Sequence, residues 1–305
     1  MATSRPARPT VSPAAERSQQ RAEALASLFP PLLVAAERVA ATVIQGVHGR
    51  RRVGQGETFW QFRRYQPGDA VDKIDWRQSA KTDRVFVRET EWEAAESVWL
   101  WRDVSPSMHY RSLKTIPEKS ERADLLTLAL AALLVRGGEH VALLGEGHPP
   151  MTGRYAINRL ADIVCRKAPP EDAPSLPRPA PLPRHAQVVL VSDFLSPLAE
   201  IDACVRGIAA RSVKGHLLQV MDPAEETLPF TGRTRFEGLE REGDTLIPRV
   251  ESVRQDYQRV LADHLAGLAD IARAVGWTFI SHCTDRPPES ALLALYLALA
   301  GEAEG

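Results

Sequence analysis

The sequence has little cysteine, and its cysteines show no metal-binding or disulfide pattern. Only three of the 305 residues are cysteine, and they form neither a CxxC pair nor a cluster with histidine, as a zinc site would require. Cys165, Cys204 and Cys283 stand in apolar runs typical of a helix or a strand. We interpret all three as reduced packing residues, which favours a cytoplasmic location over an oxidising compartment.

Long apolar runs are also absent. Residues 31–44 are interrupted by Glu37 and Arg38, and residues 291–300 form a run of only ten. A membrane-spanning helix needs about 20 consecutive, mostly apolar residues. The first residues of the chain lack the apolar core of a secretory signal. The sequence therefore predicts no membrane span.

Neither sign of charge is in excess, because 38 Lys and Arg balance 39 Asp and Glu. Any affinity for nucleic acid would have to come from a local patch. One candidate patch is the segment 50–89, in which ten basic residues stand among aromatic rings that could stack on bases. Six acidic residues are interspersed there. We therefore favour ion pairs that shape a docking surface over nucleic-acid binding.

Composition divides the chain into three parts. Residues 1–21 are rich in Pro, Ser, Ala and Arg, which predicts a disordered tail. Residues 22–83 begin with apolar residues at helical spacing, interrupted by Pro30 and Pro31, and continue into an Arg/Asp/aromatic block that we expect to pack on the body. Residues 84–301 have the pattern of one α/β domain, beginning with a strand-like stretch at 84–91.

Within residues 84–301, short apolar runs alternate with amphipathic helical patterns. Such runs predict strands that are buried on both faces, so we expect a doubly wound, mostly parallel sheet with helices on both faces. The pattern Thr115-x-x-Glu118 predicts the start of one helix, and Gly137 with Gly138 predicts its end. Residues 233–248 predict a hairpin inserted into the α/β pattern.

Oxygen-bearing side chains follow two of the predicted strands. The loop DVSPS begins at Asp103 and adds the hydroxyls of Ser105 and Ser107. Asp193 follows a second strand, and Thr152, in the loop before a helix, is a further candidate ligand. Because ligands bind at the carboxyl ends of strands in doubly wound sheets, we expect these groups at one edge. Hard oxygen donors suit magnesium, calcium or manganese and do not suit zinc or copper.

The DVSPS loop resembles a known metal site. It is similar to the Asp-x-Ser-x-Ser loop of the metal-ion-dependent adhesion site in von Willebrand factor type A domains, which adds a Thr and an Asp from two other loops. The resemblance implies that Asp103, Ser105 and Ser107 hold a divalent cation, for which magnesium is the first choice. Asp193 would then bind the ion directly or through water, with Thr152 as the remaining ligand.

A second resemblance covers residues 46–108. The stretch RRYQPGDAVDKIDWRQSAKT, followed by a strand and a D-x-S-x-S-M loop, is similar to the signature of the bacterial family catalogued as domain of unknown function 58. This resemblance implies a von Willebrand factor type A-like fold. It also implies a partnership with a MoxR-type AAA+ ATPase in the assembly or activation of other proteins.

Together these features favour a non-enzymatic protein-binding module. A partner's Asp or Glu would fill an open position on the cation, which two serine ligands leave electron-poor. Arg102 departs from the motif, because it places a second cation where it would weaken metal binding or bond to the partner's carboxylate. Two alternatives stay open. They are a metal-dependent phosphoester hydrolase, for which the loop supplies few carboxylates, and nucleic-acid binding through residues 50–88.

Overall fold

The computed structural model describes most of the α/β region and parts of the N-terminal region. The described residues are 30–48, 60–64, 79, 86–90, 97–166, 173–240 and 243–302. The tail expected at residues 1–21 and most of the Arg/Asp/aromatic block lie outside these residues. The interpretations of those two segments therefore stay predictions.

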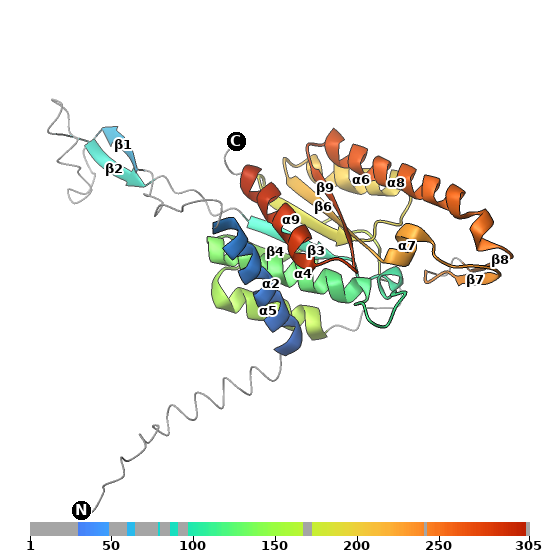
Figure 1. The fold of residues 1–305 in the computed structure, drawn as a ribbon. Coiled ribbons are helices and arrows are strands. Elements are labelled where there is room, and N and C mark those ends of the chain that lie inside the picture. The colour runs from blue at the N-terminus through green and yellow to red at the C-terminus, as the bar shows by residue number, and fades with distance from the viewer. Residues whose placement is uncertain are drawn as a thin grey trace, which may run out of the picture.

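Five parallel strands form the central sheet of the body, in the order β4-β3-β5-β6-β9 (Figure 1). Along the chain, β4 pairs with one side of β3, and β5 then returns to pair with the other side. This reversal puts a topological switch point between the carboxyl ends of β3 and β5. The strand bounds are β3 Ser97–Arg102, β4 His140–Leu143, β5 Gln187–Ser192, β6 Lys214–Met221 and β9 Thr278–Cys283.

Helices cover both faces of this sheet (Figure 1). One face carries α4 (Lys119–Gly137), α5 (Gly153–Arg166) and α9 (Pro288–Glu302), and the other carries α6 (Leu198–Ala209) and α8 (Arg254–Ala274). Side chains of β5 alternate between the two faces, so Val189 belongs to the first core and Leu190 to the second. The doubly wound parallel sheet that the sequence predicts is confirmed.

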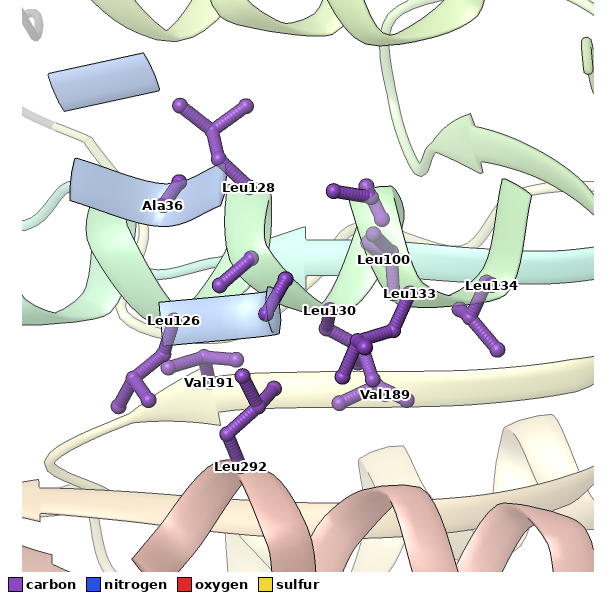
Figure 2. Packing of buried hydrophobic residues seen from close by; sticks show 14 of the residues in the cluster. Ala36, Leu100, Leu126, Leu128, Leu130, Leu133, Leu134, Val189, Val191 and Leu292 are labelled. Carbon is purple, nitrogen blue, oxygen red and sulfur yellow. The ribbon is translucent and has the colours of Figure 1, made fainter. Parts of the chain in front are cut away.

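The larger of the two cores lies under α4. Leu126, Leu130 and Leu133 of α4 lie against Val189 and Val191 of β5, as Figure 2 shows. Each of these five side chains is at most 1% exposed. Burial of one such side chain contributes about 1.5–3 kcal/mol. Helix α4 is apolar on most sides because it lies between the sheet and a further helix.

That further helix is α2 (Pro30–His48), which packs on α4 and α9. Ala36 and Ala40 are fully buried there, and their small side chains let the helices approach closely. The apolar spacing from residue 22 predicts a helix that Pro30 interrupts, whereas the described helix begins at Pro30. Proline is tolerated in the first turn of a helix because its missing N–H would have no partner there. Residues 22–29 lie outside the described part of the chain.

The start of α4 differs from the sequence prediction. Glu118, rather than Thr115, is the N-cap, and it forms a capping box with Glu121. Lys119 therefore becomes the first residue of the helix. At the other end Gly138 is left-handed, with a φ of 95°, as the pair of glycines predicts.

Smaller elements complete the described structure. The inserted hairpin that the sequence predicts consists of the antiparallel strands β7 and β8, and a second antiparallel pair joins β1 to β2. The strand pattern at residues 84–91 predicts β2, but no pattern predicts β1. The bounds are β1 Trp60–Arg64, β2 Phe86–Thr90, α7 Pro223–Thr227, β7 Thr234–Glu237 and β8 Asp244–Ile247, with 3₁₀ turns η2 at Pro106–Met108 and η3 at Val250–Ser252.

All three cysteines are free. Cys283 is buried and Cys204 is partly buried, whereas Cys165 is exposed near the end of α5. The prediction of a packing role is therefore wrong for Cys165. Among the described residues, none of the helices combines the length and apolar character that crossing a membrane requires.

Candidate functional site at the carboxyl edge of the sheet

The carboxyl ends of β3 and β5 bring Asp103 and Asp193 to the switch point. Asp103 directly follows β3, and its backbone N–H donates to the carbonyl of Val191 in β5 at 2.8 Å. Asp193 directly follows β5, and both aspartates are at most 1% exposed. Neighbouring parallel strands end at the same edge of a sheet, so these residues meet although they are far apart in the sequence.

The Asp103 carboxylate is held by donors from both strand ends. Its Oδ1 accepts from the backbone N–H of Ser105 at 2.8 Å, and its Oδ2 accepts from the Ser192 hydroxyl at 2.6 Å. Burial, and then the neighbouring Asp193 carboxylate, raise the pKa of Asp103 to about 7. The charged form of Asp103 is therefore disfavoured at this buried edge.

The two serines of the DVSPS loop lie together at this edge. Both are buried, and the Oγ atoms of Ser105 and Ser107 are 3.1 Å apart, within hydrogen-bond distance. Ser105 is the N-cap of the turn η2 and Ser107 lies within it, so this turn places their hydroxyls side by side. The structure thus brings four of the five candidate ligands to one edge of the sheet.

A lysine that the sequence analysis does not single out completes the cluster. The Lys119 ammonium donates to Asp193 Oδ2 at 2.9 Å and to Glu225 Oε1 at 2.5 Å. The Lys119 side chain is 0% exposed. Burial by itself would lower the pKa of Lys119, but the Asp193 and Glu225 carboxylates outweigh burial and raise it. The lysine therefore stays charged inside the cluster.

Glu225 comes from α7, a short helix that follows β6. The carboxylate of Asp222 caps this helix, accepting from the backbone N–H groups of Ala224 and Ser112, each at 2.8 Å. Glu225 Oε2 accepts in return from the Asp222 backbone N–H at 2.8 Å. The Tyr257 hydroxyl of α8 donates to the Glu225 carbonyl at 2.6 Å. The sequence Asp-Pro-x-Glu is a capping-box pattern with proline at the first helical position, so it is the signal that could have revealed α7.

Thr152 is not brought to this cluster. Met151 pairs in the antiparallel direction with Val141 of β4, and Val141 lies beside Val98, well before Asp103. Because this pairing is antiparallel, the residues that follow Met151 run toward the amino end of β4. Thr152 therefore lies at the outer edge of the sheet, away from its carboxyl end.

Arg102 makes its contacts with two helices of the body. Its guanidinium is 2.9 Å from Asp124 Oδ1 of α4 and donates to the Val164 carbonyl of α5 at 3.3 Å. Successive strand residues point to opposite faces, so Arg102 and Asp103 extend in different directions. Arg102 therefore ties β3 to two helices.

A cavity of about 450 Å³ opens beside the cluster. Leu195 and Leu239 line it and are about half exposed, at 50% and 46%. Oε1 of Glu240 is buried and has no hydrogen-bond partner among the described residues. The polar lining includes Ser107, Tyr110, Glu200, Glu225, Glu237 and Glu240. The cavity therefore combines apolar side chains with carboxylates.

The described residues fit a divalent cation poorly. Asp193 is bonded to the Lys119 ammonium, and Thr152 lies elsewhere. Of the expected donors, this leaves Asp103, whose two oxygens both accept hydrogen bonds, and the two serine hydroxyls, which bond to each other. Within the described ranges, no group of three or more His, Cys, Asp or Glu side chains is arranged to hold a metal ion. The magnesium ion expected from the sequence stays a prediction.

Comparison with known families identifies the chain. The model of the family described as "Protein of unknown function DUF58" matches residues 61–267, which is more than half of the sequence. The chain belongs to the DUF58 family. The DUF58 match extends well beyond residues 46–108, the segment whose motif resembles the family, and includes every residue of the cluster from Asp103 to Glu225.

Relatives of this DUF58 protein are found in mycobacteria. Uncharacterized protein Rv1480 of Mycobacterium tuberculosis is 29% identical over 259 residues, and the alignment covers 80% of each chain. Uncharacterized protein Mb1516 of Mycobacterium bovis matches to the same extent. The names of these relatives state no activity.

Two solved structures resemble this DUF58 protein at low identity. An aerotolerance-related membrane protein from Bacteroides fragilis, carrying multiple mutations to serine, is 16% identical with a TM-score of 0.42, and the match covers 68% of this chain and 99% of that one. Conserved hypothetical protein BatB from Bacteroides thetaiotaomicron is 14% identical with a TM-score of 0.39, covering 69% and 100% of the two chains. At this level of similarity, neither structure supports an inference about function.

Proposed function

We propose that this DUF58 protein is a non-enzymatic protein-binding module whose partner docks at the carboxyl edge of the sheet. It works with a MoxR-type AAA+ ATPase in the assembly or activation of other proteins, as the family resemblance implies. The observation that carries the proposal is the cavity beside the switch point, where two half-exposed leucines lie among carboxylates. Apolar anchors within a polar surround are typical of protein interfaces.

The negative charge of the cavity favours a partner that presents a basic side chain. Glu200, Glu237 and Glu240 line the cavity, and the ammonium of Lys119 is bonded to two other carboxylates. A partner's Arg or Lys would find charge-assisted hydrogen bonds there and an aromatic ring in Tyr110. The partner's Asp or Glu that the sequence predicts would need a bound metal ion, which the donor set does not favour.

Recovery of the MoxR-type ATPase encoded in the same genome tests the docking surface. Leu195→Ala and Leu239→Ala are each expected to reduce its recovery on the immobilised chain about tenfold, which corresponds to about 1.4 kcal/mol. Leu297→Ala is the matched control, because Leu297 is 51% exposed but belongs to α9, outside the cavity. Equal recovery by all three variants and wild type would contradict the proposal.

Recovery of the ATPase in magnesium buffer and in EDTA buffer distinguishes this docking from docking through a bound cation. We expect equal recovery in both buffers, because Lys119 neutralises Asp193 without an added ion. Asp103→Ala controls for magnesium that the ATPase itself binds. Recovery that EDTA and Asp103→Ala both abolish would instead support a partner's Asp or Glu on a magnesium ion.

A further inference from the structure

Lys119 is buried at a position where a cation is costly. It is the first residue of α4, and its side chain is 0% exposed. The N-terminus of a helix carries partial positive charge, so a lysine there is repelled by the helix dipole. An ammonium group is also costly to remove from water unless it is paired and hydrogen-bonded. The fold must therefore compensate this charge specifically.

The compensation comes from three separate segments of the chain. Asp193 after β5 and Glu225 in α7 accept hydrogen bonds from the ammonium, at 2.9 and 2.5 Å. The ring of Tyr110, in the loop after β3, lies 5.9 Å from Lys119 Nζ, within reach of a cation–π contact. Asp193 is itself fixed, because the Gln219 amide donates to its backbone carbonyl at 3.0 Å. These segments are arranged around one positive charge.

We propose that the Lys119 ammonium is the permanent cation of this site and takes the place of the divalent ion implied by the von Willebrand factor type A resemblance. The resemblance assigns Asp193 to the metal ion, whereas in the structure Asp193 binds the lysine. A magnesium ion touching Asp193 would lie close to the ammonium and be repelled by it. Because the lysine is part of the chain, the site assembles without metal and its occupancy does not depend on metal supply.

Metal binding by the purified full-length chain tests this proposal independently of docking, because no partner is present. Isothermal titration with magnesium and manganese compares wild type, Lys119→Ala and the control Lys114→Ala, whose lysine is exposed in the preceding loop. We expect Lys119→Ala to bind manganese at least tenfold more tightly than wild type and Lys114→Ala, because loss of the ammonium frees Asp193. Adding Asp193→Asn to Lys119→Ala is expected to abolish the gain.

Two results would overturn the proposal. One is magnesium or manganese binding by wild type that Asp193→Asn abolishes, and the other is a Lys119→Ala variant that folds but binds neither ion more tightly than wild type. Should circular dichroism show Lys119→Ala unfolded, nuclear magnetic resonance of the wild-type ammonium decides the question. We expect a Lys119 Nζ resonance that is protected from exchange without metal and unmoved by excess magnesium. Its absence, or its movement on adding magnesium, would overturn the proposal.

Discussion

One hydroxyl group joins the ends of β3 and β5. Ser192 donates to Asp103 Oδ2 at 2.6 Å and accepts from the backbone N–H of Phe194 at 2.9 Å. All three residues are buried, so water cannot replace either bond without entering the core. This side chain therefore supports the spacing of the two strand ends, in addition to the backbone bond from Asp103 to Val191.

Ser192→Ala is expected to lower the free energy of unfolding by about 1–3 kcal/mol, because it leaves a buried carboxylate oxygen and a buried N–H without partners. Urea denaturation followed by circular dichroism measures the change. Ser290→Ala is the control, since the Ser290 hydroxyl bonds at an exposed position, and it should change stability by less than about 0.5 kcal/mol. A Ser192→Ala protein as stable as this control would show that the hydroxyl does not hold the strand ends.

The sequence reveals those site residues that directly follow strands. Asp103 and Asp193 each end an apolar run, and the general behaviour of parallel sheets is enough to predict that they meet. Lys119 escapes such reasoning, because a lysine at a helix start has the same local pattern whether it is exposed or buried. Only the packing of α4 over the sheet shows that its ammonium reaches Asp193 and Glu225.

At the scale of elements, β6 lies close to the segment before β9 because of Gly215. A Cβ atom on Gly215 would come within 2.4–2.5 Å of the Trp277 ring. The ring is held in place, since Trp277 is 5% exposed and its indole N–H donates to the Val213 carbonyl at 3.1 Å. Any side chain at residue 215 would therefore force two packed elements apart.

Gly215→Ala is expected to destabilise the protein by about 1–3 kcal/mol, the usual cost of an overpacked core. Gly207→Ala in α6 is the matched control, because an added Cβ there meets nothing within 4 Å. Alanine is the better helix former, so this control should stabilise the protein by up to about 1 kcal/mol. Thermal unfolding measures the midpoint temperature of each variant. Equal midpoints would show that the Trp277 ring moves to make room for the added methyl group.

Apolar periodicity predicts the five strands and the main helices, because each must bury a continuous face. Caps and edge pairings depend on more than local sequence. Thr115 satisfies a capping pattern as well as Glu118 does, and the structure uses the second. Thr152 precedes a helix as expected, but the pairing of Met151 with Val141 turns it away from the site. No local pattern encodes that pairing.

At the scale of the whole molecule, α2 adds an outer layer over α4 and α9 (Figure 1). Val43 of α2 is 3% exposed, whereas Val34 of the same helix is 53% exposed. Val43→Asp is expected to cost at least about 3 kcal/mol, because it buries an unpaired charge between helices. Val34→Asp should stay within about 0.5 kcal/mol of wild type. Urea denaturation measures both, and similar losses would mean that α2 does not depend on this face.

The contact between α2 and α9 also sets an order of events during synthesis. Helix α2 is synthesised before α9, so part of the surface on which it packs is absent until α9 has been made. Until α9 is present, the apolar side of α2 lacks its full covering. Contacts between such distant segments form slowly, and exposed apolar surface invites aggregation meanwhile. Docking of α2 is therefore expected to be completed late in folding, after α9 has formed.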